Sequence, residues 1–129
     1  MKPSVMLTVA SLLSLLLIMF HLTDDVLLQA DGAVKYFIPV VVFVVWLYAT
    51  LMLSERMLGY IIMLLGGLVA AGMIVVHSKG GVVLKSGGFF FVWTMFALSA
   101  TGWFTVILSL RSMWLALRAR RARPPIEER

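Results

Sequence analysis

Four residues in this sequence have side chains of the kind that bind metal ions or carry protons. They are His21, Asp24, Asp25 and His77, and the two histidines are the only ones in the chain. Two imidazoles with one or two carboxylates form a ligand set that suits Zn²⁺, Cu²⁺ or Fe²⁺. Asp24 and Asp25 follow His21 by three and four residues, so on a continuous helix either carboxylate shares a face with the imidazole. Whether the four meet depends on the elements that position them.

The composition is that of a chain that lies in lipid. Hydrophobic residues make up 62% of the 129 residues and charged residues 13%, whereas soluble domains have about half and about a quarter. The length allows a single domain, residues 1–129. There is no cysteine, which excludes disulfides, thiolate metal sites and cysteine nucleophiles.

Four apolar segments are predicted to be membrane-spanning helices, because a span needs roughly 20 apolar residues. The predicted fold is therefore an all-α bundle of four transmembrane helices. A signal peptide is the alternative for the first segment, but that run is longer than the roughly 7–15 residues of a signal-peptide core. We therefore expect an uncleaved span. The predicted spans cover about residues 4–22, 36–53, 57–76 and 89–110, and a basic interfacial tail covers residues 111–129.

The segments between the spans leave two alternatives open and settle one connection. In residues 21–36, either Thr23 caps a short interfacial helix, or the first helix continues to Gly32. The two glycine pairs within residues 77–88 allow a small hairpin or an extended flap. The connection at residues 54–56 is so short that spans two and three must form an antiparallel hairpin.

The distribution of lysine and arginine predicts the topology. With the N-terminus inside, eight basic residues lie on the inner side and three on the outer side, which favours both termini in the cytoplasm. The eight are Lys2, Arg56, Arg111, Arg118, Arg120, Arg121, Arg123 and Arg129, and the three are Lys35, Lys79 and Lys85. This topology brings His21 and His77 to the same outer face. Compactness and the lack of a targeting signal favour a bacterial inner membrane.

The net charge of +5 does not indicate a nucleic-acid partner. Five of the eleven basic residues lie between Arg118 and Arg129. A basic cluster after a hydrophobic span is typical of a topology signal that contacts anionic lipid headgroups. The lipid bilayer is thus the expected partner, together with further copies of the chain or a larger membrane complex.

No acidic, basic or histidine residue falls in the middle of any predicted span, although proton-coupled transporters usually need one there. The chain is similar in size and span number to the small multidrug resistance transporters, but the membrane-embedded glutamate of their first span is missing from residues 4–22. We therefore exclude that family. No phosphate-binding loop or serine-hydrolase motif is present either.

Other polar and small residues suggest helix packing. Hydroxyl-bearing residues within the spans could hydrogen-bond between helices or to their own backbone; they are Tyr48, Thr50, Tyr60, Ser99, Thr101 and Thr105. Gly66 and Ala70, like Gly67 and Ala71, form small-xxx-small pairs that let helices approach closely. Their partner could be another span of this chain or a second copy.

Three functions remain. The first is a non-enzymatic subunit or scaffold that associates with itself or with a larger membrane complex. The second is a metal-binding protein, either a metalloenzyme or a metal carrier, with its site at His21, Asp24, Asp25 and His77; the competing interpretation is that these residues are only the polar ends of helices. The third is a small-molecule or lipid carrier that opens between spans two and three.

Overall fold

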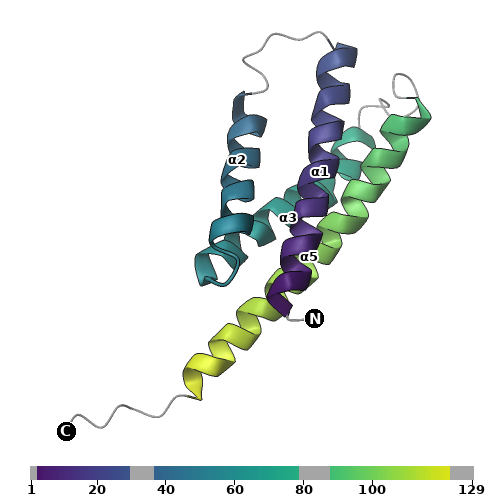
Figure 1. The fold of residues 1–129 in the computed structure, drawn as a ribbon. Helices are drawn as coiled ribbons and strands as arrows, with labels where there is room; N and C mark the ends of the chain where they lie inside the picture. The colour runs from purple at the N-terminus through teal and green to yellow at the C-terminus, as the bar shows by residue number, and fades with distance from the viewer. Residues whose placement is uncertain (1–2, 30–36, 79–87, 123–129) are drawn as a thin grey trace, which may run out of the picture.

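The computed structural model describes residues 3–29, 37–78 and 88–122, apart from the side chains of residues 3, 24–29, 77 and 78. In this part of the chain every regular element is a helix (Figure 1). The helices are α1 (Pro3–Gln29), α2 (Phe37–Met52), α3 (Met57–Ser78) and α5 (Phe89–Arg121). The predicted all-α, four-helix fold is confirmed.

Three of these helices are long and apolar enough to cross a membrane. The spanning stretches are Ser4–Thr23 in α1, Met57–Val76 in α3 and Phe89–Arg121 in α5. The remaining helix, α2, is just as apolar but has only 16 residues. At 1.5 Å per residue it is about 24 Å long, short of the roughly 30 Å of bilayer hydrocarbon. The chain is an integral membrane protein in which one helix is too short for a full span.

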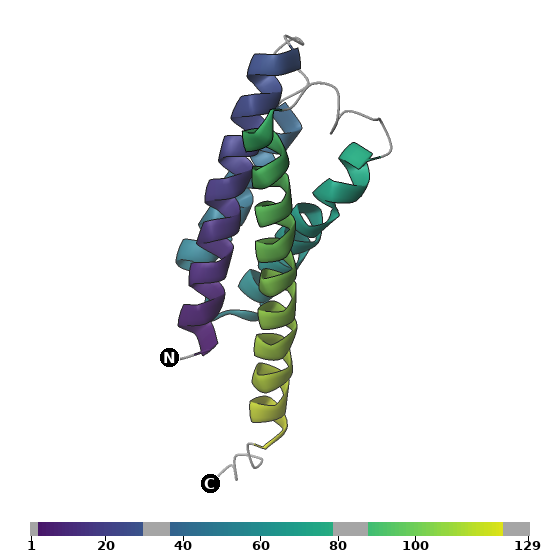
Figure 2. The ribbon, with the colours of Figure 1, turned by 90° about the vertical axis from the view of Figure 1, so that its right-hand side faces the viewer.

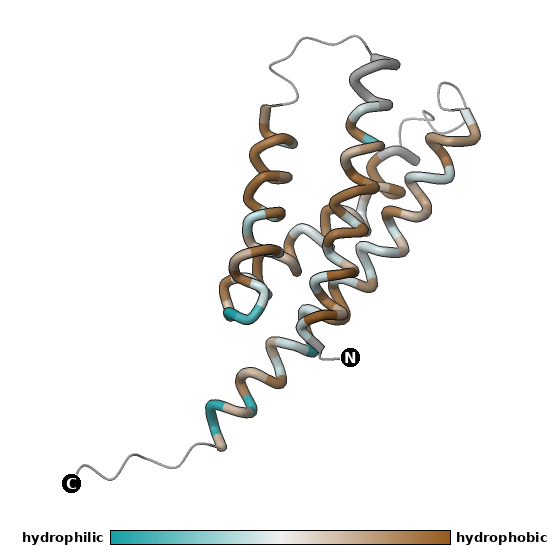
Figure 3. The backbone as a smooth tube through the Cα atoms, viewed as in Figure 1, coloured by the Kyte–Doolittle hydropathy of each residue, from teal (hydrophilic) through white to brown (hydrophobic). Residues whose placement is uncertain are grey.

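The helices alternate in direction, so that α1 and α5 lie side by side and antiparallel (Figures 1 and 2). The tight turn between α2 and α3 lies at the same end of the bundle as the start of α1 and the end of α5. Figure 3 shows that hydrophilic residues gather at this turn and along the last turns of α5, which project beyond the other helices. This end of the bundle therefore carries most of the charge in the described part of the chain.

Small residues bring α3 and α5 into close contact. A Cβ added at Gly67 would lie 3.0 Å from the carbonyl oxygen of Gly102, and one added at Gly102 would lie 2.9 Å from the Cβ of Ala70. The Ser99 hydroxyl donates a buried hydrogen bond of 2.9 Å to the carbonyl oxygen of Ala71 at the same crossing. The partner of the Gly67/Ala71 pair is thus α5 of the same chain.

The neighbouring pair is also used within the chain. The indole ring of Trp46 on α2 covers Gly66 so closely that any Cβ there would collide with it. The turn that makes this contact possible is closed by backbone hydrogen bonds of 3.0 Å from the Leu53 amide to the Ala49 carbonyl and 2.9 Å from the Arg56 amide to the Leu53 carbonyl. Both small-residue pairs of α3 therefore pack within the bundle, against α2 and α5.

Two helices extend past the predicted spans. α1 continues to Gln29, so residues 21–29 are helical; a separate interfacial helix beginning at Thr23 does not form. α5 continues without a break from Phe89 to Arg121. The basic residues of its last turns therefore belong to the same helix as the span. Gly32 and the segment 79–87, where we predicted a hairpin or flap, lie outside the described residues.

Candidate functional site

His21 is buried inside the bundle. Its exposed fraction is 0%, and its ring lies against Phe91 of α5 with the ring centroids 4.9 Å apart and the planes tilted by 34°. The preceding residue, Phe20, makes an edge-on contact with Phe90 at 6.3 Å. The two consecutive aromatic contacts join the C-terminal half of α1 to the first turn of α5.

The other predicted metal ligands are placed only by their backbones. Asp24 and Asp25 belong to the unbroken α1, one turn after His21, and His77 belongs to the last turn of α3. Figure 2 shows that this end of α3 leans away from α1. No group of three metal-binding side chains occurs among those that the structure describes, and three of the four predicted ligands are not among them. The metal site stays a prediction.

A chain of buried hydrogen bonds joins α1 to α2 (Ser11, Trp46 and Thr50). The Trp46 indole Nε1 donates to the Ser11 hydroxyl at 2.8 Å, and the Ser11 and Thr50 hydroxyls lie 2.8 Å apart. The Thr50 hydroxyl in turn donates to the carbonyl oxygen of Trp46 at 2.8 Å. These three side chains are at most 1% exposed, so no solvent competes for their hydrogen bonds.

The direction of every proton in this chain follows from the number of donors. A hydroxyl has one hydrogen to donate. Because Thr50 gives its hydrogen to the Trp46 carbonyl, Ser11 must be the donor to Thr50. Ser11 can do so because it accepts its other bond from Trp46. All three polar groups are then satisfied at once, which is the condition under which a buried polar cluster stabilises a structure.

A second pair of hydroxyls, Ser14 on α1 and Thr105 on α5, is less favourably arranged. Their oxygens lie 3.2 Å apart. Ser14 also lies 3.0 Å from the carbonyl oxygen of Ala10, and Thr105 lies 3.0 Å from that of Thr101. Since each hydroxyl has one hydrogen, the bond between the helices forms only when one of the two leaves its backbone carbonyl. This contact is therefore weaker than the one at Ser11.

Two further hydroxyls are buried on α5 without such partners. Ser109 is 0% and Ser112 is 5% exposed. Neither oxygen has a hydrogen-bond partner among the described residues. A hydroxyl placed this way contributes no stabilising contact and carries the cost of being removed from water. These two hydroxyls therefore lower the stability of the bundle, whereas the hydrogen-bonded ones raise it.

The sequence indicated part of this interior and missed the rest. Thr50, Ser99 and Thr105 were expected to hydrogen-bond between helices or to their own backbone. Thr50 and Thr105 do both, and Ser99 hydrogen-bonds between helices. Ser11 and Trp46 were not singled out, although they form the best-satisfied contact. The spacing of Ser11 and Ser14, three residues apart on one face of a mostly apolar span, was the available signal.

The site that the structure describes is thus a set of hydrogen-bonded contacts between helices. His21 adds an aromatic contact between α1 and α5. It has no described constellation of nucleophile, base and oxyanion donor. Comparison of the chain with protein-family models, with curated proteins and with solved structures gave no match.

Proposed function

We propose that this chain is a non-enzymatic structural subunit of the membrane, which associates with further copies of itself or with a larger membrane complex. The observation that carries the proposal is the use of its interior polar groups. The hydroxyls of Ser11 and Ser99 donate across helix–helix contacts, and the Thr50 hydroxyl accepts from Ser11 while it donates to the Trp46 carbonyl of its own helix. A transport pathway or reaction centre needs polar groups that remain available to a substrate.

The same inference follows from the rarity of buried charge. Among the described residues, His21 is the only acid, base or imidazole in the buried interior. Its ring is engaged by Phe91 between α1 and α5. An interior of this kind holds a shape rather than moving protons or ions.

The short helix α2 supplies the surface for association. A helix shorter than the hydrocarbon thickness leaves a mismatch that thinning of the bilayer or oligomerisation can relieve. α2 directs a broad apolar face away from the bundle, with Val40, Val44 and Leu51 each more than half exposed. Covering that face with helices of a neighbouring subunit removes the mismatch, and we propose this face as the contact.

The proposal includes the setting of the protein. We place both termini in the cytoplasm of a bacterial cell and the bundle in the inner membrane, with the α2–α3 turn on the cytoplasmic side. The excess of basic residues at that end supports the orientation. The exposed Arg56 in the turn and the exposed arginines at the end of α5 all lie there.

Native mass spectrometry of protein extracted in lipid nanodiscs tests the proposal. We expect a defined oligomer or a complex with another membrane protein, in a fixed stoichiometry that survives dilution. A strict monomer without a partner, at all concentrations and after the gentlest extraction, would contradict it.

One observation favours a second function, metal binding. Because α1 is unbroken to Gln29, Asp24 and Asp25 follow His21 on one helix at the spacing of neighbours along a helix face. We propose, as the alternative, that these three residues and His77 together bind one divalent transition-metal ion at the outer face of the membrane. The site would bind Zn²⁺, Cu²⁺ or Fe²⁺ and make the protein a metal carrier or metalloenzyme.

Elemental analysis of the purified protein distinguishes this alternative. It predicts about one equivalent of bound metal, which is lost in Asp24→Asn and His77→Ala. Asp31→Asn is the matched control, since it removes a carboxylate outside the predicted set. Protein that retains no metal after incubation with Zn²⁺, Cu²⁺ or Fe²⁺ rules the site out.

A further inference from the structure

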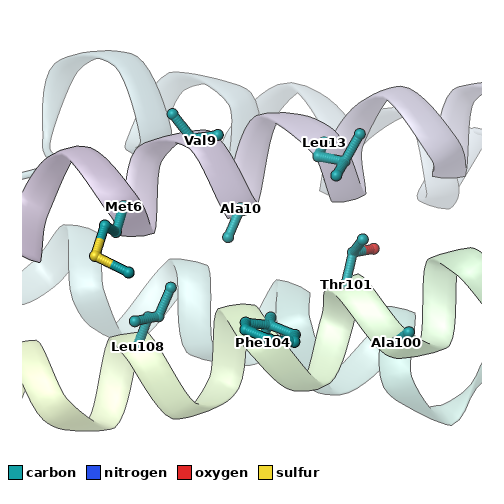
Figure 4. Close-up of a pocket in the computed structure, with 8 residues that line it drawn as sticks. All are labelled: Met6, Val9, Ala10, Leu13, Ala100, Thr101, Phe104 and Leu108. Atoms are coloured by element: carbon teal, nitrogen blue, oxygen red, sulfur yellow. The ribbon is translucent and has the colours of Figure 1, made fainter. Parts of the chain in front are cut away.

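An apolar groove runs along the lipid-facing side of the contact between α1 and α5 (Figure 4). Its volume is about 450 Å³, within the roughly 300–1,000 Å³ of pockets that hold small ligands. Its lining includes Met6 and Leu13 of α1 and Ala100, Phe104 and Leu108 of α5. The hydroxyl of Thr101, its single polar side-chain group, donates to the carbonyl oxygen of Leu98 at 3.1 Å. The groove therefore offers apolar contact only.

The depth of the groove matches one leaflet of a bilayer. Ala100 and Leu108 are eight residues apart on α5, which corresponds to about 12 Å along the helix axis. One half of the hydrocarbon layer is about 15 Å thick. An acyl chain that enters from the headgroup region at the charged end of the bundle can lie in the groove for most of its length.

At the charged end of the groove, α5 carries a basic residue, Arg111, on the same helix face as the residues that line the groove. Arg111 follows Phe104 by seven residues and Leu108 by three, so it lies on the face of α5 that lines the groove. Arg118 lies another seven residues on, and its guanidinium sits 5.3 Å from the centroid of the Trp114 ring. Both arginines are exposed. A guanidinium is well suited to bind a phosphate oxygen pair.

From this arrangement we propose that the α1–α5 groove is a binding site for one anionic phospholipid. An acyl chain fills the apolar groove, and the headgroup phosphate pairs with Arg111. The site is expected to prefer an anionic lipid to a zwitterionic one, because the basic residues at this end of α5 attract anionic headgroups. The site serves to fix the long α5 at a defined depth.

Lipid retention measured by native mass spectrometry tests the proposal. The probes are phosphatidylglycerol and phosphatidylcholine with identical acyl chains, added to protein in mild detergent. Wild-type protein is expected to retain one phosphatidylglycerol in preference to phosphatidylcholine. Arg111→Gln is expected to reduce that preference about fivefold, the effect of one basic residue near an anionic surface.

Arg120→Gln is the matched control for charge. Arg120 is nine residues from Arg111 and therefore lies on the opposite side of α5, so this variant is expected to keep the preference. Ala100→Leu fills the groove and is expected to abolish retention of the lipid. Ala119→Leu adds the same volume at an exposed position outside the groove and is expected to leave retention unchanged.

Three outcomes would overturn the proposal. Equal retention of the two lipids by wild-type protein would remove the charge recognition. An equal loss in Arg111→Gln and Arg120→Gln would show diffuse attraction instead of a site. A protein dimer that dissociates in Ala100→Leu, without any change in lipid retention, would mean that a second copy occupies the groove.

Discussion

Each buried hydroxyl of this bundle has one hydrogen to donate, and this limit decides which contacts stabilise the bundle. In the group formed by Trp46, Ser11 and Thr50, every hydrogen-bond donor has an acceptor. Ser14 and Thr105 must share their hydrogens between each other and the backbone. In hydrocarbon no water can replace a lost partner. The three groups of hydroxyls should therefore respond differently to removal.

Ser11→Ala is predicted to destabilise the protein by about 1–2 kcal/mol, because it leaves the buried Trp46 N–H without an acceptor. Ser14→Ala should cost only about 0.6 kcal/mol, the average for a hydrogen bond between membrane helices. Unfolding by a denaturing detergent in mixed micelles measures both changes.

Ser109→Ala provides the contrast at the same scale. The Ser109 hydroxyl is buried without a partner among the described residues, so its removal should leave the free energy of unfolding unchanged or raise it by up to about 1 kcal/mol. A loss as large as that of Ser11→Ala would show that Ser109 has a partner of its own.

At the scale of whole helices, close approach depends on a few positions without side chains. Gly66 accommodates the Trp46 ring of α2, and Gly67 and Gly102 form the crossing of α3 and α5. The hydrogen bond of Ser11 requires Trp46 to lie where it does. Close packing at Gly66 and the polar contact between α1 and α2 therefore depend on each other.

Gly66→Ala is predicted to destabilise the bundle by about 1–3 kcal/mol, the usual cost of inserting a methyl group into a filled contact. Gly72→Ala, on the same helix, has no atom within 4 Å of the added Cβ and should change stability by less than about 0.5 kcal/mol. The same unfolding assay compares the two variants. Equal effects would mean that Trp46 does not cover Gly66.

The Gly66→Ala variant should also shift the fluorescence of Trp46. If the ring is displaced, its N–H loses the Ser11 hydroxyl, and the emission of that indole changes in a protein where Trp93, Trp103 and Trp114 are replaced by phenylalanine. An unaltered spectrum alongside a loss of stability would place the cause elsewhere in α3.

For the molecule as a whole, the sequence predicted the number of helices, because each apolar run is long enough to form one. It also predicted a full second span, whereas α2 has only 16 residues. It could not predict that α1 continues past Thr23, since the capping pattern at Thr23 was equally consistent with a new helix. The burial of His21 depends on how α1 is rotated about its axis, since this brings His21 against Phe91. The sequence pattern does not reveal that rotation, because apolar residues lie on every side of α1. The Ser11–Trp46 contact was missed because the spacing of Ser11 and Ser14 marks a polar face of α1 but does not say which helix this face meets.

The orientation in the membrane is a prediction at this scale. The chain has no cysteine, so single cysteines can be introduced and labelled with a reagent that does not cross membranes. Glu55→Cys and Arg120→Cys lie at the same end of the bundle and should be labelled from the cytoplasmic side only. Lys79→Cys should be labelled from the outside only. Labelling of Glu55→Cys and Lys79→Cys from the same side would refute the four-helix topology.

The central claim, association through α2, is tested most directly by photo-cross-linking in native membranes. A benzophenone maleimide is attached to Val44→Cys on α2 or to Leu65→Cys on α3, two positions with matched exposed fractions of 56% and 57%. Illumination is predicted to give a discrete protein–protein adduct from position 44 and only lipid adducts from position 65. Only lipid adducts at both positions, or the same ladder of protein adducts from both, would contradict the account.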